Sequence, residues 1–261
     1  MDRAPLLELC DVSKQYSGLE ALSHVSFAVE IGTITALIGP NGAGKSTTFN
    51  LISGLEHPTS GRILFAGAYI THLAAHKRAL LGIGRIFQTP RIFDYLTVLE
   101  NVMVGLHPRA QSGVIRCGLR LPGVRAEERR IRDEAMAMLR FVDLADVPDQ
   151  MAGTLPFGGQ RLLEFARALV ADPKLMLLDE PTAGLTPAET DAFAEKLLAK
   201  LAQGMTTLIV EHDLRFIASI AGKIVVLAHG RKIYDGAPSG IRNDPQVVEA
   251  YVGTRHERQH A

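Results

Sequence analysis

Residues 33–47 read TITALIGPNGAGKST, and this stretch decides the fold class. Its first seven residues form an apolar run with β-branched side chains, which predicts a buried strand. Residues 39–46, GPNGAGKS, match the pattern G-x-x-x-x-G-K-[ST], and TTFNLISGL, which comes next, predicts a helix. The pattern therefore stands where it is required to stand, between a strand and a helix. It predicts a phosphate-binding loop; the alternative is a glycine-rich turn with a surface lysine.

The chemistry of this loop comes from its backbone. Glycines adopt conformations closed to other residues, so the N–H groups of the loop and of the helix N-terminus can surround an anion. Lys45 is expected to reach the β- and γ-phosphates of ATP, and Ser46 to ligate Mg²⁺. The expected ATP-binding residues are those of the whole loop: Gly39, Pro40, Asn41, Gly42, Ala43, Gly44, Lys45, Ser46 and Thr47.

A second apolar strand, KLMLLDE, ends in two carboxylates, Asp179 and Glu180. Neighbouring carboxylates at the end of a buried strand are costly unless they hold a metal or move a proton. Asp179 fits the acid that holds Mg²⁺ in phosphate-loop ATPases, and Glu180 can act as the general base on the attacking water. The alternative is a pair of ordinary strand-end carboxylates that face solvent.

Segments typical of strands and helices alternate along the chain. Residues 6–12 and 21–30 predict strands with a turn over 13–20, residues 82–88 predict another strand, and 89–142 turn helical. This alternation favours a mostly parallel sheet covered by helices, with a helical lobe inserted between two strand-rich halves. Together with the phosphate-loop pattern, the expected fold class is α/β: a P-loop NTPase core with a mostly parallel sheet, an N-terminal antiparallel β subdomain and the inserted helical lobe.

The expected domain boundaries follow from the same pattern. Residues 1–88 and 166–252 are expected to form the ATP-binding core, and residues 89–165 a helical subdomain with a basic insertion near 107–126. Residues 253–261 are expected to be a flexible tail because they are polar and terminal.

Composition narrows the possible partners and locations. The chain has 28 Lys and Arg against 28 Asp and Glu, so no global basic charge favours nucleic acid as a partner. Cys10 and Cys117 match no metal or redox spacing. The N-terminus has no long apolar segment typical of a signal peptide, and no apolar run approaches the ~18 residues of a membrane span. We therefore expect a soluble, cytoplasmic chain.

Three further residues gain meaning only from their order along the chain. Tyr16, Gln88 and His212 are each plain when taken alone, as a turn or core aromatic, a strand-end amide and a strand-end histidine. Together with GPNGAGKS, LPFGGQ followed by ARALV, LMLLDEPTAGLTP and VEHD, they stand in an order that resembles the nucleotide-binding subunit of an ABC transporter across essentially the whole chain.

The resemblance implies roles for these three residues. Tyr16 would stack on the adenine of ATP, a contact that needs only an aromatic face. Gln88 would touch Mg²⁺ or the attacking water and report the nucleotide state to the membrane subunits. His212 would contact the γ-phosphate. The expected catalytic residues are thus Glu180, His212 and Gln88, and the expected metal ligands are Ser46, Gln88 and Asp179.

A narrower resemblance is to the ATPases of branched-chain amino-acid importers, the larger of the two paired types. It rests on GRIFQTPRIFDYLTVLENVMVGLH, the long insertion after it, LLDEPTAGLTPAET and the ending IRNDPQVVEAYVG. It implies an ATP-hydrolysing motor at the cytoplasmic face of the inner membrane of a bacterium. The implied partners are a second ATPase, two permeases and an extracytoplasmic solute-binding protein.

Other functions stay open at this point. Relatives of the narrower pattern serve urea uptake and lipopolysaccharide export, and no residue of a nucleotide-binding subunit touches the cargo. A regulatory subunit that binds ATP and hydrolyses it weakly is a candidate of another class. A soluble ABC ATPase acting on ribosomes or DNA is a third, but such proteins carry two fused cassettes or a long coiled coil.

The basic insertion offers two interpretations. It carries Arg109, Arg116, Arg120 and Arg125 with no acidic residue among them. It could approach anionic lipid, at ~1 kcal/mol for each cation near the surface, or it could be a solvated loop.

Two positions depart from the family's pattern. The phosphate-gripping signature would be Pro156, Phe157, Gly158, Gly159 and Gln160, with proline in place of the family's serine. Pro156 lacks a hydroxyl and an N–H, although Gly158 and Gly159 still offer N–H groups at a helix N-terminus. The second departure is Thr186, where the family has Asp or Asn, and the sequence TPAE predicts a capping box with Glu189. A weakened signature favours a heterodimer with an intact partner over a homodimer.

Overall fold

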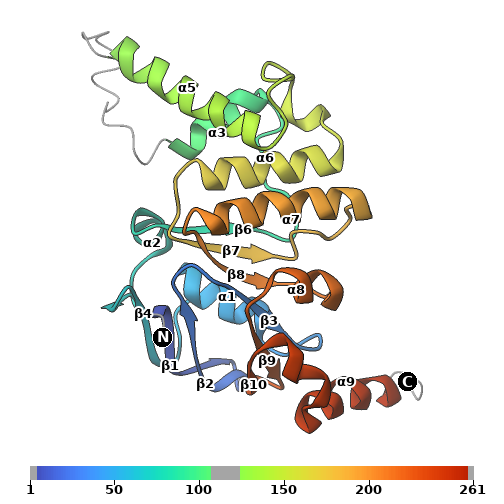
Figure 1. Cartoon of the computed structure of the whole chain (residues 1–261). Coiled ribbons are helices and arrows are strands. Elements are labelled where there is room, and N and C mark those ends of the chain that lie inside the picture. The colour runs from blue at the N-terminus through green and yellow to red at the C-terminus, as the bar shows by residue number, and fades with distance from the viewer. Residues whose placement is uncertain (1–4, 107–123, 258–261) are drawn as a thin grey trace. The chain divides into compact units, whose positions relative to one another are not determined.

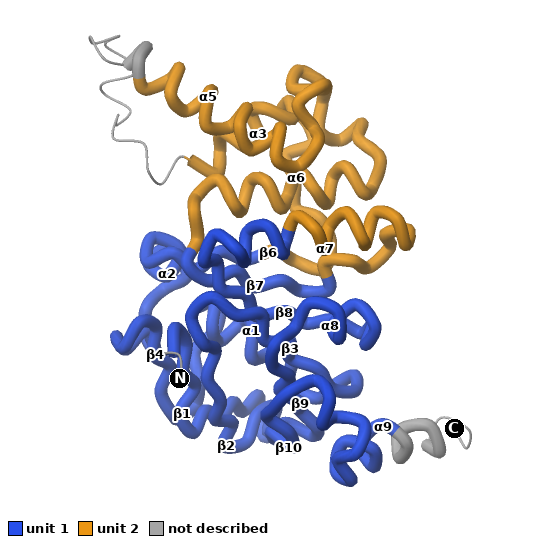
Figure 2. Tube along the Cα trace, viewed as in Figure 1, with its two compact units in different colours: residues 1–85, 174–180, 197–261 blue, residues 86–173, 181–196 orange. Residues whose placement is uncertain are grey.

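The computed structural model describes residues 5–106 and 124–257 and falls into two compact units. Unit 1 contains residues 1–85, 174–180 and 197–261, and unit 2 contains residues 86–173 and 181–196 (Figure 2). The basic insertion near 107–126 and the tail 253–261 lie outside the residues whose side chains are described. Within the described ranges, no helix is both long and apolar enough to cross a membrane.

Unit 1 begins with an antiparallel sheet of four strands in the order β2-β1-β4-β5 (Figure 1). Its strands are β1 (Pro5–Tyr16), β2 (Leu19–Glu30), β4 (Ser60–Phe65) and β5 (Ala68–Tyr69). The turn predicted over residues 13–20 is wrong, because Lys14 pairs with Leu22 and Tyr16 with Leu19. Only Ser17 and Gly18 turn, both with positive φ, as a two-residue hairpin requires.

The second sheet of unit 1 has six strands in the order β10-β9-β3-β8-β7-β6. Its strands are β3 (Ile34–Ile38), β6 (Ile83–Ile86), β7 (Leu175–Asp179), β8 (Thr206–Val210), β9 (Lys223–Ala228) and β10 (Arg231–Gly236). β3 pairs in parallel with β8 and β9, β7 pairs in parallel with β8, and β10 closes the edge antiparallel to β9. Every residue of β3, β7 and β8 is buried, as expected for parallel strands covered on both faces.

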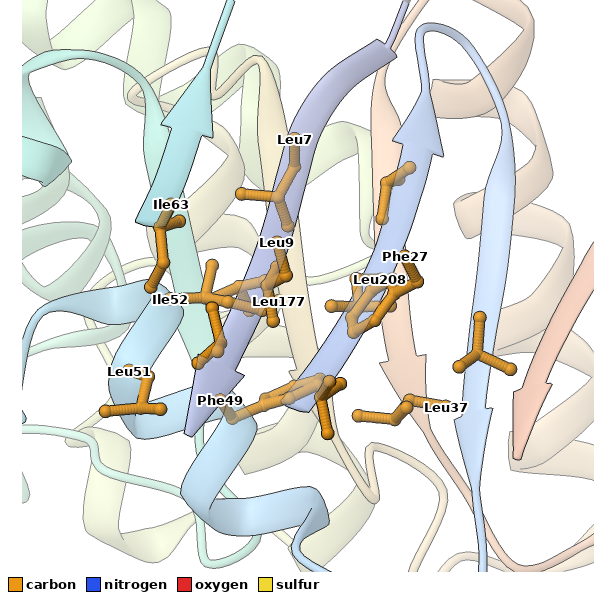
Figure 3. Close-up of a cluster of buried hydrophobic side chains, with 14 of the residues drawn as sticks. Leu7, Leu9, Phe27, Leu37, Phe49, Leu51, Ile52, Ile63, Leu177 and Leu208 are labelled. Carbon is orange, nitrogen blue, oxygen red and sulfur yellow. The ribbon is translucent and has the colours of Figure 1, made fainter. Parts of the chain in front are cut away.

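The core of unit 1 joins both sheets through one helix, α1 (Lys45–Ser53). Figure 3 shows side chains from the antiparallel sheet, α1 and the parallel sheet gathered in a single cluster, among them Leu9, Phe49, Leu177 and Leu208. All four are at most 2% exposed. The helix that follows the glycine-rich loop is therefore anchored on its apolar face, which holds the loop in place.

Unit 1 also contains α2 (Ala75–Leu80), α8 (Leu214–Ile220), the 3-10 helix η3 (Pro238–Asn243) and α9 (Pro245–Glu257), together with the last part of α7 (Pro187–Ala202). Asp213 caps α8, because its carboxylate accepts the N–H groups of Arg215 at 2.8 Å and Phe216 at 3.3 Å. The predicted α/β fold, with a mostly parallel sheet and an antiparallel β subdomain, is confirmed.

Unit 2 is helical. It contains α3 (Val98–Leu106), α5 (Val124–Phe141), α6 (Phe157–Leu169) and the first part of α7 (Pro187–Ala202). Helical structure was predicted from residue 89, but α3 begins only at Val98, where Thr97 and Glu100 form a reciprocal capping box. The strand predicted over 82–88 ends at Ile86. The capping box explains the late start, because its bonds satisfy the first N–H groups of the helix.

Candidate nucleotide-binding site

The glycine-rich loop passes directly from β3 into α1 (Figure 1). Gly39 has φ 155°, and a Cβ there would lie 2.1 Å from the carbonyl oxygen of Leu227 on β9. Gly44 has φ 103°, and a Cβ there would lie 2.5 Å from a side-chain carbon of Leu22. Both positions therefore require glycine, which lets the loop approach its neighbours and turn its N–H groups toward a ligand.

The start of α1 is suited to binding an anion. Gly44 is its N-cap residue, and within the described residues no side chain caps the first turn. The N–H groups of that turn and the positive end of the helix dipole are what phosphate requires. This backbone is compatible with the predicted phosphate site.

The side chain of Lys45 folds back into the glycine-rich loop. Its Nζ donates to the carbonyl oxygens of Gly39 at 2.7 Å and Pro40 at 3.0 Å, and its side chain is buried. Burial lowers the pKa of Lys45, while the charges of Glu180 and Asp179 raise it. A phosphate in the loop would add a negative charge next to the ammonium, which would form a charge-assisted hydrogen bond with it.

Glu180 follows β7 in a conformation rare for a residue with a side chain. Its φ is 48°, and its N–H donates to the carbonyl oxygen of Val210 at 2.9 Å. Left-handed backbone at a non-glycine residue costs free energy and persists where the surrounding structure enforces it, which is typical of functional sites. The conformation directs the carboxylate toward His212, whose Nε2 lies 2.8 Å from Glu180 Oε1.

The Glu180–His212 pair joins two strand ends that are neighbours in the parallel sheet. Glu180 follows β7, and His212 comes two residues after β8. The imidazole is half exposed and the carboxylate is mostly buried, with side-chain exposures of 50% and 18%. A histidine that bonds a carboxylate fixes its orientation and can exchange a proton with it. The pair is therefore equipped to orient a water molecule and accept its proton.

Asp179 is held by a residue that sequence reasoning missed. Arg85 Nη2 lies 3.3 Å from Asp179 Oδ2, and both side chains are nearly buried. Burial raises the pKa of Asp179, and Arg85 opposes that rise. A divalent cation would relieve the same desolvation cost, so this carboxylate fits the single-acid magnesium sites completed by phosphate and water. The described residues contain no cluster of three or more His, Cys, Asp or Glu that could hold a metal alone.

A cavity of about 540 Å³ brings several of the predicted residues together. It is lined by the loop residues from Asn41 to Thr47 and by Glu180 and His212. The other lining residues, to which no sequence motif pointed, come from the start of β2 and from the β9–β10 turn: Leu19, Glu20, Ala21, His229 and Gly230. Gly39, Pro40, Asp179 and Tyr16 do not line it.

Tyr16 lies beside the cavity and contacts one of its lining residues. Its hydroxyl donates to a carboxylate oxygen of Glu56 and accepts a hydrogen bond from Thr47, which does line the cavity. Lys14 Nζ lies 4.8 Å from the ring centroid, and Tyr16 is 38% exposed. The position is compatible with an aromatic platform beside the bound nucleotide.

Comparison with known proteins agrees with this geometry. The family model described as ABC transporter matches residues 22–183. The high-affinity branched-chain amino acid transport ATP-binding protein BraF of Pseudomonas aeruginosa is 39% identical over 251 residues, which cover 95% of this chain and 98% of BraF. The corresponding protein LivG of Escherichia coli strain K12 is 37% identical, with the same coverage.

The chain belongs to the ABC transporter family.

Solved structures show that the whole fold is that of an ATP-binding cassette. A nucleotide-free cassette from an ABC transporter superposes with a TM-score of 0.83 at 32% identity, covering 95% of this chain and 99% of that one. A cassette in its ADP conformation gives the same TM-score and identity, covering 96% and 99%. This cassette is therefore the ATP-hydrolysing subunit of an ABC transporter.

The predicted signature residues open α6 of the cassette, in unit 2. Pro156 is the N-cap residue, Phe157 begins the helix, and Gly158 and Gly159 lie in its first turn. Gln160 folds back, with its Nε2 donating to the carbonyl oxygen of Leu155 at 3.0 Å. The expected placement of the two glycines at a helix N-terminus is confirmed.

The two departures from the family pattern lie next to each other. Thr186 forms the predicted capping box, donating its N–H and its hydroxyl to Glu189 Oε2, each at 2.8 Å. A Cβ at Gly158 would lie 2.1 Å from the other carboxylate oxygen of Glu189. The ring of Phe157 would lie 3.0 Å from a Cβ at Gly184. The signature turn and the turn before α7 are therefore packed as one structure, which their sequence separation concealed.

Gln88 also belongs to unit 2. Its carbonyl oxygen accepts Arg161 Nη2 at 2.5 Å, and that of Phe87 accepts Arg161 Nη1 at 2.7 Å. Arg161 is fully buried on α6 and pairs with Glu164 at 3.0 Å. Glu164 in turn accepts the N–H of Arg91 at 3.1 Å. The backbone around Gln88 is thus attached to the helix that carries the signature.

Sequence reasoning also missed Tyr251 on α9. The N–H of Gly39, the first glycine of the loop, bonds to the Tyr251 hydroxyl oxygen. Burial raises the pKa of this phenol, and the Gly39 bond opposes the rise. No sequence pattern could predict this contact, because Tyr251 and the glycine-rich loop lie near opposite ends of the chain.

The Thr186–Glu189 capping box predicts a pH dependence of stability. Bonds from the Thr186 backbone and side chain lower the pKa of Glu189 below its ordinary 4.5. A lowered carboxyl pKa adds stability above the unfolded value, and this is lost as pH falls through the folded value. Glu189→Gln should therefore lower the melting temperature at neutral pH, by an amount that shrinks in acid. Glu195→Gln, which changes an exposed glutamate of the same helix, is the control; equal, pH-independent shifts in both variants would contradict the assignment.

Proposed function

We propose that this ATP-binding cassette drives the import of branched-chain or other hydrophobic amino acids. The support is its 39% identity to BraF and 37% identity to LivG, each along nearly the full length of both chains. Both relatives are named as high-affinity branched-chain amino acid transport ATP-binding proteins. The cassette would work at the cytoplasmic face of a bacterial inner membrane with two permeases and a solute-binding protein.

The site residues have separate tasks in this proposal. The N–H groups at the start of α1 and the Lys45 ammonium bind the β- and γ-phosphates, and Tyr16 contacts the adenine. Glu180 takes the proton of the attacking water, and His212, 2.8 Å away, holds that carboxylate in place and contacts the γ-phosphate. The observation that carries hydrolysis is this pair beside the phosphate loop in one cavity.

Ser46 and Asp179, both in unit 1, would hold Mg²⁺. The bound cation would neutralise charge on the phosphate oxygens during transfer. What the chain itself supplies is a buried carboxylate with a raised pKa and a hydroxyl at the start of α1. Lowering the pH should weaken cation binding at Asp179 because a proton competes for the carboxylate.

Reconstitution tests the cargo. The cassette would be placed in liposomes with its permeases and their binding protein, and uptake of labelled leucine would be compared with uptake of labelled urea. ATP-dependent leucine uptake supports the proposal. Urea uptake without leucine uptake would overturn the cargo assignment and leave the ATPase assignment unchanged. Export of lipopolysaccharide by the complex would have the same consequence.

We further propose that the working form is a heterodimer with a second ABC ATPase. In the family the signature turn grips the γ-phosphate held by the opposing subunit, and Pro156 can offer that phosphate neither a hydroxyl nor an N–H. This chain keeps the glycine-rich loop, Glu180 and His212, so pairing with an intact signature would give one strong site. A homodimer would contain two weakened sites.

Pro156→Ser tests this point. A hydrogen bond to a charged group contributes ~1.5–3 kcal/mol, so restoring it should raise the ATP turnover of the isolated chain by about 10- to 100-fold. Pro156→Ala is the matched control, since it removes the ring without adding a hydroxyl. If wild-type turnover is brisk and cooperative and equals that of Pro156→Ser, the heterodimer has no physical basis.

A regulatory subunit that hydrolyses ATP weakly is the second candidate, and Pro156 is the observation that favours it. Steady-state turnover with the partner ATPase separates the two functions. Turnover that stays near the background with an intact partner, while ATP binding persists, would favour regulation. Turnover restored by the partner supports the motor.

A further inference from the structure

A chain of polar side chains runs through unit 1 from Asp179 to Tyr16. Arg85 on β6 pairs with Asp179 at 3.3 Å, and its Nη1 donates to Asn50 Oδ1 at 2.9 Å. Asn50 on α1 donates its Nδ2 to Glu56 Oε1 at 2.9 Å. The other carboxylate oxygen of Glu56 accepts the hydroxyl of Tyr16. Four consecutive contacts thus connect the expected cation ligand with the expected adenine platform.

The chemistry of this chain allows one orientation of the central amide. Asn50 must present its oxygen to a guanidinium, which only donates, and its NH₂ to a carboxylate, which only accepts. Turning the amide over would put donor against donor and acceptor against acceptor. Ser53 accepts a second bond from Arg85 Nη1 at 2.9 Å, which holds the guanidinium against α1. Asn50 therefore transmits orientation between its two neighbours.

Glu56 is the point at which several donors meet. Lys14 Nζ lies 3.4 Å from the oxygen that also accepts Tyr16, and Glu56 is 26% exposed at its side chain. Burial pulls the pKa of Glu56 upward, but the bonds from Tyr16, Asn50 and Lys14 outweigh it and lower the pKa. The residue is therefore an anion around which the tyrosine hydroxyl and the asparagine amide are arranged.

The arrangement restricts the ring of Tyr16. Its hydroxyl is held by Glu56 and Thr47, and Lys14 lies 4.8 Å from its ring centroid. A platform that only had to offer an aromatic face to adenine would need none of these bonds, since stacking requires only the ring. The hydroxyl bonds instead set the plane in which the ring lies.

We propose that Asn50 and Glu56 are positioning residues that orient Tyr16 for the base of the nucleotide and, through Arg85, couple base recognition to cation binding at Asp179. The proposal rests on the roles proposed above for Tyr16 and Asp179. A cation at Asp179 competes with Arg85 for the carboxylate. The ion pair between Arg85 and Asp179 then weakens, and the hydrogen bond from the guanidinium to Asn50 becomes stronger. The amide then becomes a stronger donor to Glu56, as chains of hydrogen bonds polarise one another. Cation and base should strengthen each other's binding, because coupling is reciprocal.

Calorimetric binding of two probes tests the proposal. One probe is ATP and the other is inorganic tripolyphosphate, which lacks the base. Each probe is titrated into the protein twice, once with Mg²⁺ present and once with EDTA. The ratio of the two dissociation constants, tripolyphosphate over ATP, is the base factor. In the wild type, Mg²⁺ should raise the base factor several-fold. A change in folding alone would weaken both probes together and leave the ratio unchanged.

Variants of the side chains between Tyr16 and Asp179 test each contact of the polar chain, which we call the bridge. Tyr16→Phe keeps the aromatic face and removes the hydroxyl, and it should lower the base factor about tenfold with Mg²⁺ present. Glu56→Ala should do the same, and the double variant should lose no more than either single one, as for residues that act through one contact. Asn50→Ala should make the base factor insensitive to Mg²⁺. Tyr69→Phe, at a tyrosine that is 62% exposed on β5, is the matched control.

The outcomes separate the bridge from the nucleotide site. If Tyr16→Phe keeps the wild-type base factor, stacking alone suffices and the positioning role is overturned. If Asn50→Ala keeps the wild-type response to Mg²⁺, the coupling is overturned. If the wild type binds neither probe, or Lys45→Ala binds both as tightly as the wild type, the nucleotide-site assignment fails and the bridge fails with it.

Discussion

Replacing Glu180 with glutamine is expected to lower ATP turnover by about 10²–10⁴-fold and to leave ATP binding intact. The amide keeps the shape of the side chain and its contact distance of 2.8 Å to His212, but it cannot accept the proton of the attacking water. Phosphate release should be measured at saturating ATP, in the wild-type chain and in a Pro156→Ser background, where turnover is expected to be higher. Equilibrium binding of ATP gives the second readout.

The comparison with Glu195→Gln makes this prediction specific. Glu195 is an exposed glutamate on α7, so its replacement should change neither quantity. Turnover of Glu180→Gln within tenfold of the wild type would show that another group accepts the proton. If ATP binding were lost together with turnover, Glu180 would be needed for the structure of the phosphate loop and not for accepting the proton of the water.

Replacing Arg78 with leucine is expected to destabilise the protein by ~3 kcal/mol or more, although Arg78 takes no part in the reaction. Arg78 is fully buried on α2. Its guanidinium donates to four carbonyl oxygens: those of Leu73, Leu51, Ile52 and Thr71 at 2.8, 2.5, 2.9 and 3.0 Å.

Two of these carbonyls belong to the last turn of α1, whose carbonyls have no partner within the helix. The cation also lies at the negative end of the helix dipole. Burial lowers the pKa of Arg78 to about 10, so the group remains charged at neutral pH. Leucine would leave the carbonyls buried without their donor, and the cost of stranded polar groups exceeds the gain from an apolar side chain.

The measurement is the melting temperature and the urea midpoint of Arg78→Leu. A loss of ~3 kcal/mol corresponds to a fall of roughly 6–12 °C for a chain of this size. Lys77→Leu changes the preceding, exposed residue of α2 and should shift the melting temperature by little. Equal melting temperatures in the two variants would show that the carbonyls find other donors, such as water.

Much of the site was predictable because its chemistry is local. The conformations of Gly39 and Gly44, and the exit of the loop into α1, depend on consecutive residues, so a short pattern encodes them. The capping box of Thr186 and Glu189 is likewise a spacing of three residues. The turn predicted before β2 was wrong because Tyr16 and its neighbours are polar, yet pairing with β2 decides that they are strand.

Contacts between distant residues were beyond such patterns. Arg85 and Asp179 are 94 positions apart and meet because β6 and β7 are neighbours in the sheet. Tyr16 and Glu56 are 40 positions apart and meet where β1 ends and α1 has just ended. Each partner has an ordinary surface interpretation until the sheet order is known.

The sequence alone therefore predicted the glycine-rich loop between a strand and a helix, the two carboxylates at the end of β7 and the alternation of strands and helices, because backbone conformation and burial periodicity are encoded over a few residues. Only the tertiary structure decided that Glu180 meets His212, that Arg85 holds Asp179 and that Glu56 holds Tyr16. The physical reason is that strand order in a sheet places charges from distant segments within bonding distance, and the free energy of each pair exists only once that order has formed.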